Sequence, residues 1–241
     1  MPHRSAGPSH YDWEAPAYDL FNEKNSEPLN RLLTRILRKR GAKMVLDLAC
    51  GTGSQVLWLA QRGFRVVGRD INSRMLGIAR RKAPTADLRR GDMRTTRAGR
   101  FDAVLTISNA VGHLTRSDFV RAMRNIRANL APDGVYVFDL FNLEWLRAGD
   151  NITKLTIDWS DRGVRQVQYS TLNTHGVLES STTVMTNRGV TRNVQTLQVY
   201  TAKELDDMLC RSGFRGVRLK AIDGSRFSRH HTKRILVIAE A

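Results

Sequence analysis

The chain has 241 residues, of which 41% are hydrophobic, enough for one sizeable globular domain with an insertion. Its formal net charge of +16 at pH 7 favours an anionic partner such as nucleic acid, although a codon bias toward arginine explains it equally well. Because the arginines are scattered and no aromatic residues alternate with them, the single-strand-binding pattern is missing and nucleic-acid binding is the less favoured reading.

The first part of the chain is predicted to be an N-terminal arm over residues 1–27. Residues 1–10 carry no periodic pattern and are expected to be a flexible tail, and an aromatic, acidic stretch with Tyr11 and Tyr18 follows. A helix is predicted next, with Pro28 in its first turn. Its apolar residues fall at helical spacing: Leu29, Leu32, Leu33, Ile36 and Leu37.

From residue 43 the apolar pattern alternates between strands and helices. Strands are expected over 43–48, 64–69, 86–90, 101–107 and 135–140, and helices over 53–62, 72–82 and 117–130. Strands interleaved with helices require right-handed crossovers, which build a parallel sheet covered on both faces. In such a doubly wound sheet, ligands bind at the carboxyl ends of the strands.

The alternation changes at about residue 150. Four segments rich in Thr, Val, Ile and Tyr are separated by glycine-containing turns, and we expect an antiparallel β-meander. These segments are 152–159, 164–172, 177–186 and 191–200. The meander is therefore an insertion over residues 150–200 into a core that comprises residues 28–149 and 201–241.

The C-terminal part of the chain returns to the core. Thr201 and Glu204 fit a capping box that opens a helix ending near Arg211. Two strands, 214–222 and 234–239, are adjacent in sequence and predict an antiparallel pair at one edge of the sheet. The expected fold class is α/β, with a doubly wound, mostly parallel seven-stranded sheet, an antiparallel edge strand and the inserted β-meander.

The stretch Val45–Ser54 carries the strongest functional pattern. An apolar strand runs into Asp47, then into a small-residue turn with Ala49, Gly51 and Gly53, and then into a helix. The glycines tolerate positive φ and let the backbone approach a ligand at the helix N-terminus. A dinucleotide-binding loop needs a third glycine and a P-loop needs a lysine before Ser or Thr, and neither is present. NAD is therefore disfavoured as the cofactor.

The same stretch resembles motif I of the class I S-adenosylmethionine-dependent methyltransferases, and the segments that follow agree with it. The resemblance covers about residues 43–140. It implies a Rossmann-like core in which Asp47, Ala49, Gly51 and Gly53 surround the methionine part of the cofactor S-adenosyl-L-methionine. Asp47 alternatively only orients the loop through backbone amides.

Three further segments extend the resemblance. Asp70 and Ile71 stand where the family places an acid on the ribose hydroxyls, and one carboxylate can accept both hydroxyl donors. Asp92 and Met93 resemble the adenine-contacting segment, although Asp92 reads equally well as a turn residue and Met93 as a core residue. The motif IV loop, which borders the transferred methyl group, corresponds to Ser108 and Asn109.

The chemistry implied by this resemblance makes few demands on the protein. The sulfonium is already an activated electrophile, so the protein has mainly to align an acceptor with the methyl group and exclude water. We expect no metal ion, because His230 and His231 lie in a basic loop-like segment. His113 follows a strand and is a candidate general base, with a structural role as the alternative, and a deprotonated amine acceptor needs no base.

The acceptor side is less constrained by the sequence. Tyr11 and Tyr18 resemble the aromatic lid that many small-molecule members close over the cofactor, and simple packing is the alternative. The insertion 150–200 resembles the substrate-covering or dimer-forming insertion of small-molecule N- and O-methyltransferases, including those acting on amino sugars, so a homodimer is one option. The motif IV loop lacks the signatures of adenine- and cytosine-methylating enzymes.

We therefore expect a methyltransferase (EC 2.1.1.-) that moves a methyl group to an N or O atom of a small molecule. An RNA methyltransferase and a non-catalytic protein with a methyltransferase-like core are the alternatives. No apolar run approaches the about 18 residues of a membrane span, and the N-terminus lacks the apolar core of a secretory signal. Because Cys50 and Cys210 lie far apart and form no disulfide framework, a cytoplasmic location without a membrane partner is the default.

Overall fold

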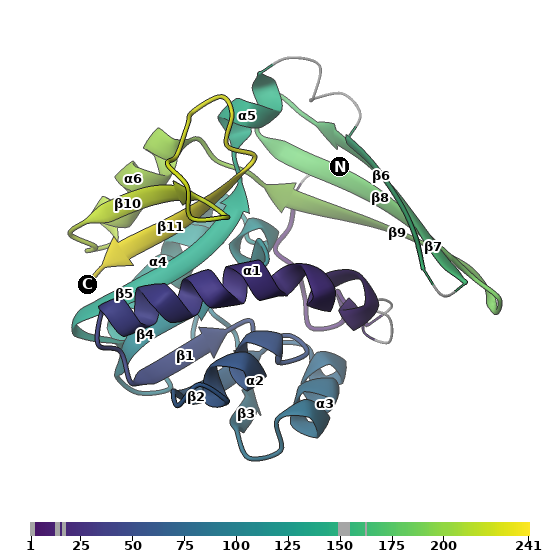
Figure 1. The fold of residues 1–241 in the computed structure, drawn as a ribbon. Coiled ribbons are helices and arrows are strands. Elements are labelled where there is room, and N and C mark those ends of the chain that lie inside the picture. Colours follow the sequence, from purple (N-terminus) through teal and green to yellow (C-terminus); the bar gives the residue numbers. More distant parts are fainter. Residues whose placement is uncertain (1–2, 13–14, 16–17, 149–154, 162) are drawn as a thin grey trace.

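The computed structural model describes residues 3–12, 15, 18–148, 155–161 and 163–241 (Figure 1). Its central element is a seven-stranded sheet with strand order β10-β11-β5-β4-β1-β2-β3. The strands are β1 Met44–Leu48, β2 Arg65–Asp70, β3 Asp87–Arg90, β4 Phe101–Thr106, β5 Leu130–Phe141, β10 Val217–Ala221 and β11 Arg234–Glu240. The expected α/β fold with a mostly parallel seven-stranded sheet is confirmed.

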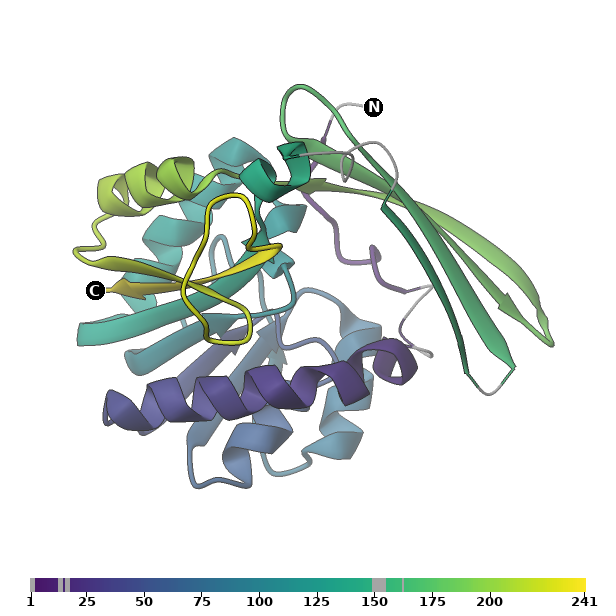
Figure 2. The same ribbon diagram turned by 45° about the horizontal axis from the view of Figure 1, so that its top comes forward.

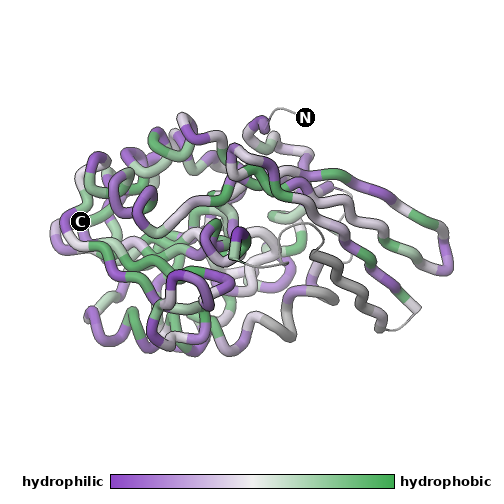
Figure 3. Tube along the Cα trace, turned by 90° about the horizontal axis from the view of Figure 1, so that it is seen from above, coloured by the Kyte–Doolittle hydropathy of each residue, from purple (hydrophilic) through white to green (hydrophobic). Residues whose placement is uncertain are grey.

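Helices cover both faces of this sheet because alternate strand residues point to opposite sides. Val45 and Ala103 pack in one cluster with α1 Tyr18–Lys39, α2 Ser54–Ala60 and α3 Ser73–Lys82. Leu46 and Val104 pack in the other with α4 Arg116–Asn129 and α6 Ala202–Arg211. Figure 3 shows the apolar segments gathered in the middle of this core.

The strand order places a topological switch point between β1 and β4. From β1 the chain moves outward through β2 to β3, and then crosses to β4 on the other side of β1. Crossovers in opposite directions leave a crevice above the carboxyl ends of the two strands, the usual ligand position in such sheets. The loop after β1 begins at Ala49, and the short helix η1 Ala110–His113 follows β4.

The C-terminal strands form the expected antiparallel pair at one edge. β11 runs antiparallel to both β5 and β10. The reversed strand therefore lies one position in from the edge, and β10 is the edge strand. The capping box is present: the Thr201 side chain accepts from the backbone N–H of Glu204, and the Glu204 carboxylate accepts from the backbone N–H of Thr201.

The predicted meander is a second, four-stranded antiparallel sheet that projects from the core (Figure 2). Its strands are β6 Leu155–Asp161, β7 Val164–Leu172, β8 Val177–Thr186 and β9 Gly189–Gln198. Leu178, Leu197 and Val199 anchor its base against Leu143 and Leu146 of α5 Leu143–Arg147. The part of the first predicted strand over 152–154 lies outside the described residues.

Two expectations about the N-terminal part are wrong. α1 begins at Tyr18, so Pro28 lies inside the helix and the boundary at residue 27 falls in mid-helix. A proline there removes one backbone hydrogen bond, which a helix packed along the sheet tolerates. The described part of the expected flexible tail, residues 3–10, is held by hydrogen bonds, including those from His3 to Leu114 and from Ala6 to His113. Among the described residues, no helix is long and apolar enough to cross a membrane.

Candidate functional site

The loop after β1 owes its shape to residues with positive φ. Ala49, Gly51 and Gly53 have φ values of 116°, 54° and 83°. The backbone N–H groups of Ala49 and Cys50 both donate to the Arg69 carbonyl, at 2.8 and 3.1 Å, so β2 holds the start of the loop. The loop consequently presents backbone rather than side chains toward the crevice.

Asp70, at the end of β2, fixes the other half of this loop. Its Oδ2 accepts from the Gly51 N–H at 2.8 Å and its Oδ1 from the Asn72 N–H at 2.8 Å. Asn72 in turn caps α3, since its Oδ1 accepts from the Met75 N–H at 2.9 Å. One carboxylate thus ties the glycine loop to the start of α3, and each of its oxygens retains a lone pair.

A partly enclosed cavity lies above these strand ends. Most of the predicted site residues line it: Tyr11, Tyr18, Ala49, Gly51, Asp70, Ile71, Asp92, Met93, Ser108 and His113. Three predicted residues do not line it: Asp47, Gly53 and Asn109. Gly53 instead lies against Ala79 of α3. The tertiary structure therefore brings together five separate sequence regions around one cavity: the arm, the glycine loop, the end of β2, the loop after β3 and the loop after β4.

Ser108 and Asn109 shape the loop after β4. Both have positive φ, 65° and 58°. The Ser108 N–H donates to the buried Asp139 Oδ1 at 2.7 Å, and the Asn109 side chain accepts from the Phe141 N–H at 3.3 Å. Asn109 therefore braces the loop from behind. Sequence reasoning missed Asp139, although it stands near the carboxyl end of β5, where acids in such sheets often serve the site.

Two buried acids, Asp47 and Asp70, lie at the glycine-loop end of the cavity, and Asp70 is part of its lining. Asp47 is 1% exposed, and burial, with the nearby Asp70 charge second, raises its pKa to about 8. Burial also raises the pKa of Asp70, against the opposing effect of its backbone hydrogen bonds. Both shifts make this end of the cavity a favourable place for a cationic ligand group, because a nearby positive charge stabilises the ionised carboxylates.

The N-terminal arm forms the opposite wall. The Tyr11 hydroxyl lies 2.6 Å from His113 Nε2, and the Tyr11 ring meets the Tyr18 ring edge-on at 6.0 Å. His10, which the sequence analysis left in the flexible tail, also lines the cavity, with its ring centroid 5.0 Å from that of His113. Burial lowers the pKa of His10, and a contact with the Gln195 amide of β9 opposes that shift.

His113 is a neutral imidazole in this structure. It is 8% exposed, and burial, followed by repulsion from His10 and His3, lowers its pKa to about 3. Among the described residues its Nδ1 has no hydrogen-bond partner, while Nε2 faces Tyr11. A buried, uncharged nitrogen that lines the cavity is a suitable contact for a bound ligand or its exchangeable proton.

This shift predicts an acid-dependent loss of stability. The unfolded His113 takes up a proton below its ordinary pKa of 6.5, while the folded form stays neutral down to about 3. Lowering the pH below 6.5 therefore favours unfolding, by about 1.4 kcal/mol at about pH 5.5 from this residue. Urea denaturation of wild type and His113→Gln at about pH 7.5 and 5.5 measures it, with the exposed His175→Gln as control. An equal loss in His113→Gln and wild type would contradict the assignment.

The comparisons with known proteins agree with this geometry. Residues 45–134 match the family model described as a methyltransferase domain. This segment is therefore similar to a methyltransferase domain. The matched segment runs from the start of β1 to the first half of β5, and it includes the glycine loop, Asp70, Asp92 and His113.

Individual relatives extend the likeness beyond that segment. The dTDP-3-amino-3,6-dideoxy-alpha-D-glucopyranose N,N-dimethyltransferase of Streptomyces fradiae is 37% identical over 150 residues, which are 58% of this chain and 59% of that protein. The chain spans 55–59% of the length of three such curated relatives.

Solved structures match nearly the whole chain. DesVI from Streptomyces venezuelae has a TM-score of 0.75 at 26% identity, covering 93% of this chain and 97% of its own. A SAM-bound amino pentose methyltransferase from Micromonospora echinaspora has a TM-score of 0.71 at 26% identity, with coverages of 88% and 90%. The likeness therefore includes the second sheet, which the family model does not reach.

Proposed function

We propose that this chain is an S-adenosylmethionine-dependent methyltransferase that methylates an amine nitrogen of a small molecule. The observation that carries the proposal is the Asp70 carboxylate, which faces the cavity at the end of β2 and holds the glycine loop by Gly51. The methyltransferase domain over residues 45–134 and the SAM-bound relative support the same reading.

The cavity has the donor and acceptor set that the cofactor requires. Asp70 retains acceptor capacity for two ribose hydroxyls, and Ile71 and Met93 supply apolar walls for a purine ring. The buried pair Asp47 and Asp70 favours the positive charge of the methionine end. When bound, the cofactor supplies an activated methyl group, and the residues of this chain orient it and exclude water.

The acceptor is proposed to enter between the N-terminal arm and the second sheet. His10 and Tyr11 of the arm line the cavity, and His3 of the same arm lies 2.8 Å from the Thr196 hydroxyl of β9. The neutral Tyr11–His113 pair offers hydrogen bonds without a positive charge, so it does not repel the ammonium that forms when a neutral amine gains a methyl group. The relatives from Streptomyces fradiae and Micromonospora echinaspora are named as methyltransferases of amino sugars, which favours a sugar amine as the acceptor.

Two measurements test this function. Isothermal titration with S-adenosylmethionine is expected to give saturable one-site binding, whereas NAD gives none. Incubation with labelled cofactor is expected to label a dTDP-amino sugar and not bulk tRNA. A wild-type protein that shows no saturable heat with S-adenosylmethionine would refute the function, and label on tRNA alone would support the RNA alternative.

A further inference from the structure

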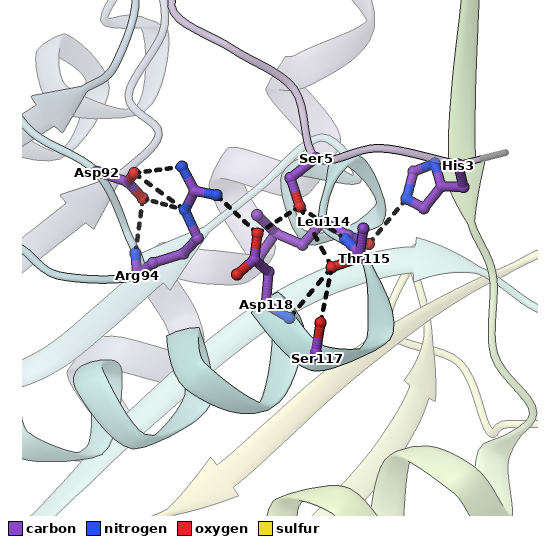
Figure 4. A network of polar contacts seen from close by, with 8 residues as sticks. All are labelled: His3, Ser5, Asp92, Arg94, Leu114, Thr115, Ser117 and Asp118. Carbon is purple, nitrogen blue, oxygen red and sulfur yellow. Dashed lines mark hydrogen bonds and ion pairs between the residues drawn. The ribbon is translucent and has the colours of Figure 1, made fainter.

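A chain of polar contacts joins the cavity wall to the N-terminal arm (Figure 4). It runs from Asp92, after β3, through Arg94 to Asp118 in the first turn of α4, and from there to Ser5. Asp92 and Arg94 line the cavity, and Ala6, next to Ser5, lines it from the other side. The contacts therefore connect two sides of the cavity along one edge.

Three N–H groups of Arg94 hold the Asp92 carboxylate. The Arg94 backbone N–H donates to Oδ1 at 2.9 Å, Nη2 donates to Oδ2 at 2.6 Å, and the Nε–H is shared between the two oxygens at 3.0 Å each. A carboxylate offers about four lone-pair sites. Most of the acceptor capacity of Asp92 is therefore taken by Arg94, whichever of its two expected roles, adenine contact or turn residue, it has.

Arg94 is connected to the N-terminal arm through Asp118. Its Nη1 donates to Asp118 Oδ2 at 2.7 Å, and the Ser5 hydroxyl donates to the same oxygen at 2.6 Å. Ser5 Oγ also accepts from the Thr115 N–H at 2.9 Å. One hydroxyl therefore satisfies both the acid in the first turn of α4 and the amide of the N-cap residue.

A second anchor holds the arm just before this point. His3 Nε2 donates to the Leu114 carbonyl at 2.9 Å, and Nδ1 lies 2.8 Å from the Thr196 hydroxyl of β9. The Ala6 N–H donates to the His113 carbonyl at 2.9 Å. The arm is thus fastened to the core and to the second sheet on either side of Ser5.

Arg94 is the central residue of this series of polar contacts, because it carries the positive charge between two carboxylates. Two carboxylates share its guanidinium, and the side chains of Asp92, Arg94 and Asp118 are only 22–25% exposed. Without that positive charge, Asp92 and Asp118 would repel each other across the gap. The position of the arm and the position of the loop after β3 therefore depend on the same side chain.

We propose that Arg94 is a positioning residue that latches the N-terminal arm over the bound cofactor through Asp118 and Ser5. Asp92 then acts on the cofactor indirectly, by orienting Arg94. This proposal rests on the proposed function, since it takes S-adenosylmethionine or its product as the occupant of the cavity. The coupling is reciprocal: if ligand binding stabilises the closed position of the arm, then the closed arm raises the affinity of the ligand by the same factor.

The test compares Ser5→Ala with the matched control Ser117→Ala. Ser117 stands in the same first turn of α4, but its hydroxyl contacts only Thr115 Oγ1, at 3.2 Å, among the described residues. Stopped-flow measurement of S-adenosylhomocysteine is expected to show release accelerated about three- to tenfold in Ser5→Ala, with association changed less than twofold. Ser5→Thr, which keeps the hydroxyl, and Ser117→Ala are expected to match wild type.

Hydrogen exchange supplies the second readout. In Ser5→Ala and Arg94→Gln, the amides of residues 6–12 are expected to exchange faster with and without ligand, and the ligand is expected to protect them less than in wild type. Unchanged release and unchanged arm exchange in both variants, with normal binding in wild type, would overturn the latch and leave the proposed function intact. If wild type binds neither S-adenosylmethionine nor S-adenosylhomocysteine, the proposed function falls and the latch falls with it.

Discussion

Replacing Asp70 with asparagine is expected to raise the dissociation constant of S-adenosylmethionine by about 10- to 150-fold, which corresponds to about 1.4–3 kcal/mol. The carboxylate accepts from the Gly51 and Asn72 amides and retains lone pairs toward the cavity. An amide nitrogen in place of one oxygen faces a backbone N–H or a ribose hydroxyl with a donor instead of an acceptor. Both the loop geometry and the ligand contact are lost together.

Isothermal titration measures this effect, and Asp87→Asn is the matched control. Asp87 lies on the neighbouring strand β3, where its carboxylate pairs with Arg69, the residue before Asp70. It does not line the cavity. Asp87→Asn is therefore expected to bind the cofactor like wild type. Equal dissociation constants for Asp70→Asn and wild type would show that Asp70 makes no contact with the cofactor.

Replacing Gly53 with alanine is expected to destabilise the fold by about 2–5 kcal/mol. Gly53 has a φ of 83°, which costs an alanine about 1–2 kcal/mol. An added Cβ would also lie 3.0 Å from Ala79 Cβ and 3.2 Å from Ala79 Cα, where α3 passes the start of α2. Pushing these elements apart adds about 1–3 kcal/mol of overpacking and displaces the glycine loop from its ligand position.

Gly63→Ala separates these two costs. Gly63 has nearly the same φ, 86°, but nothing lies within 4 Å of its hypothetical Cβ. Its variant should therefore lose only the conformational part, about 1–2 kcal/mol. Urea denaturation of both variants measures the difference, which reports the close approach of Ala79. If the two substitutions cost the same, the packing of α3 on the glycine loop is looser than the structure indicates.

The comparison of Gly51 and Gly53 also shows where pattern reasoning stops. The resemblance implied a cofactor role for both glycines, yet only Gly51 lines the cavity. Gly53 lies where another helix passes close by. For Asp92 the sequence left an adenine contact and a turn role equally open, and the structure adds the contact between its carboxylate and Arg94, two residues later. A local pattern marks residues that are constrained, but it does not say which neighbour constrains them.

The N-terminal arm is a case in which the sequence carries no local pattern although the structure is ordered. Residues 3–10 have no hydrophobic period, which is why they were expected to be flexible. Their order comes from single hydrogen bonds to residues more than 100 positions away, such as His3 to Leu114 and Ser5 to Asp118. Contacts of that kind leave no periodic trace in the sequence.

The sequence by itself determined the alternation of strands and helices, the inserted meander, the capping box at Thr201 and the glycine loop with Asp70, because these features depend on local periodicity, turn chemistry and short spacings. Only the tertiary structure decided that the arm closes the cavity, that His113 is buried and neutral beside Tyr11, and that Arg94 joins Asp92 to Asp118. Burial and charge pairing between distant segments arise only when the whole chain has folded, and they set the chemistry of this site.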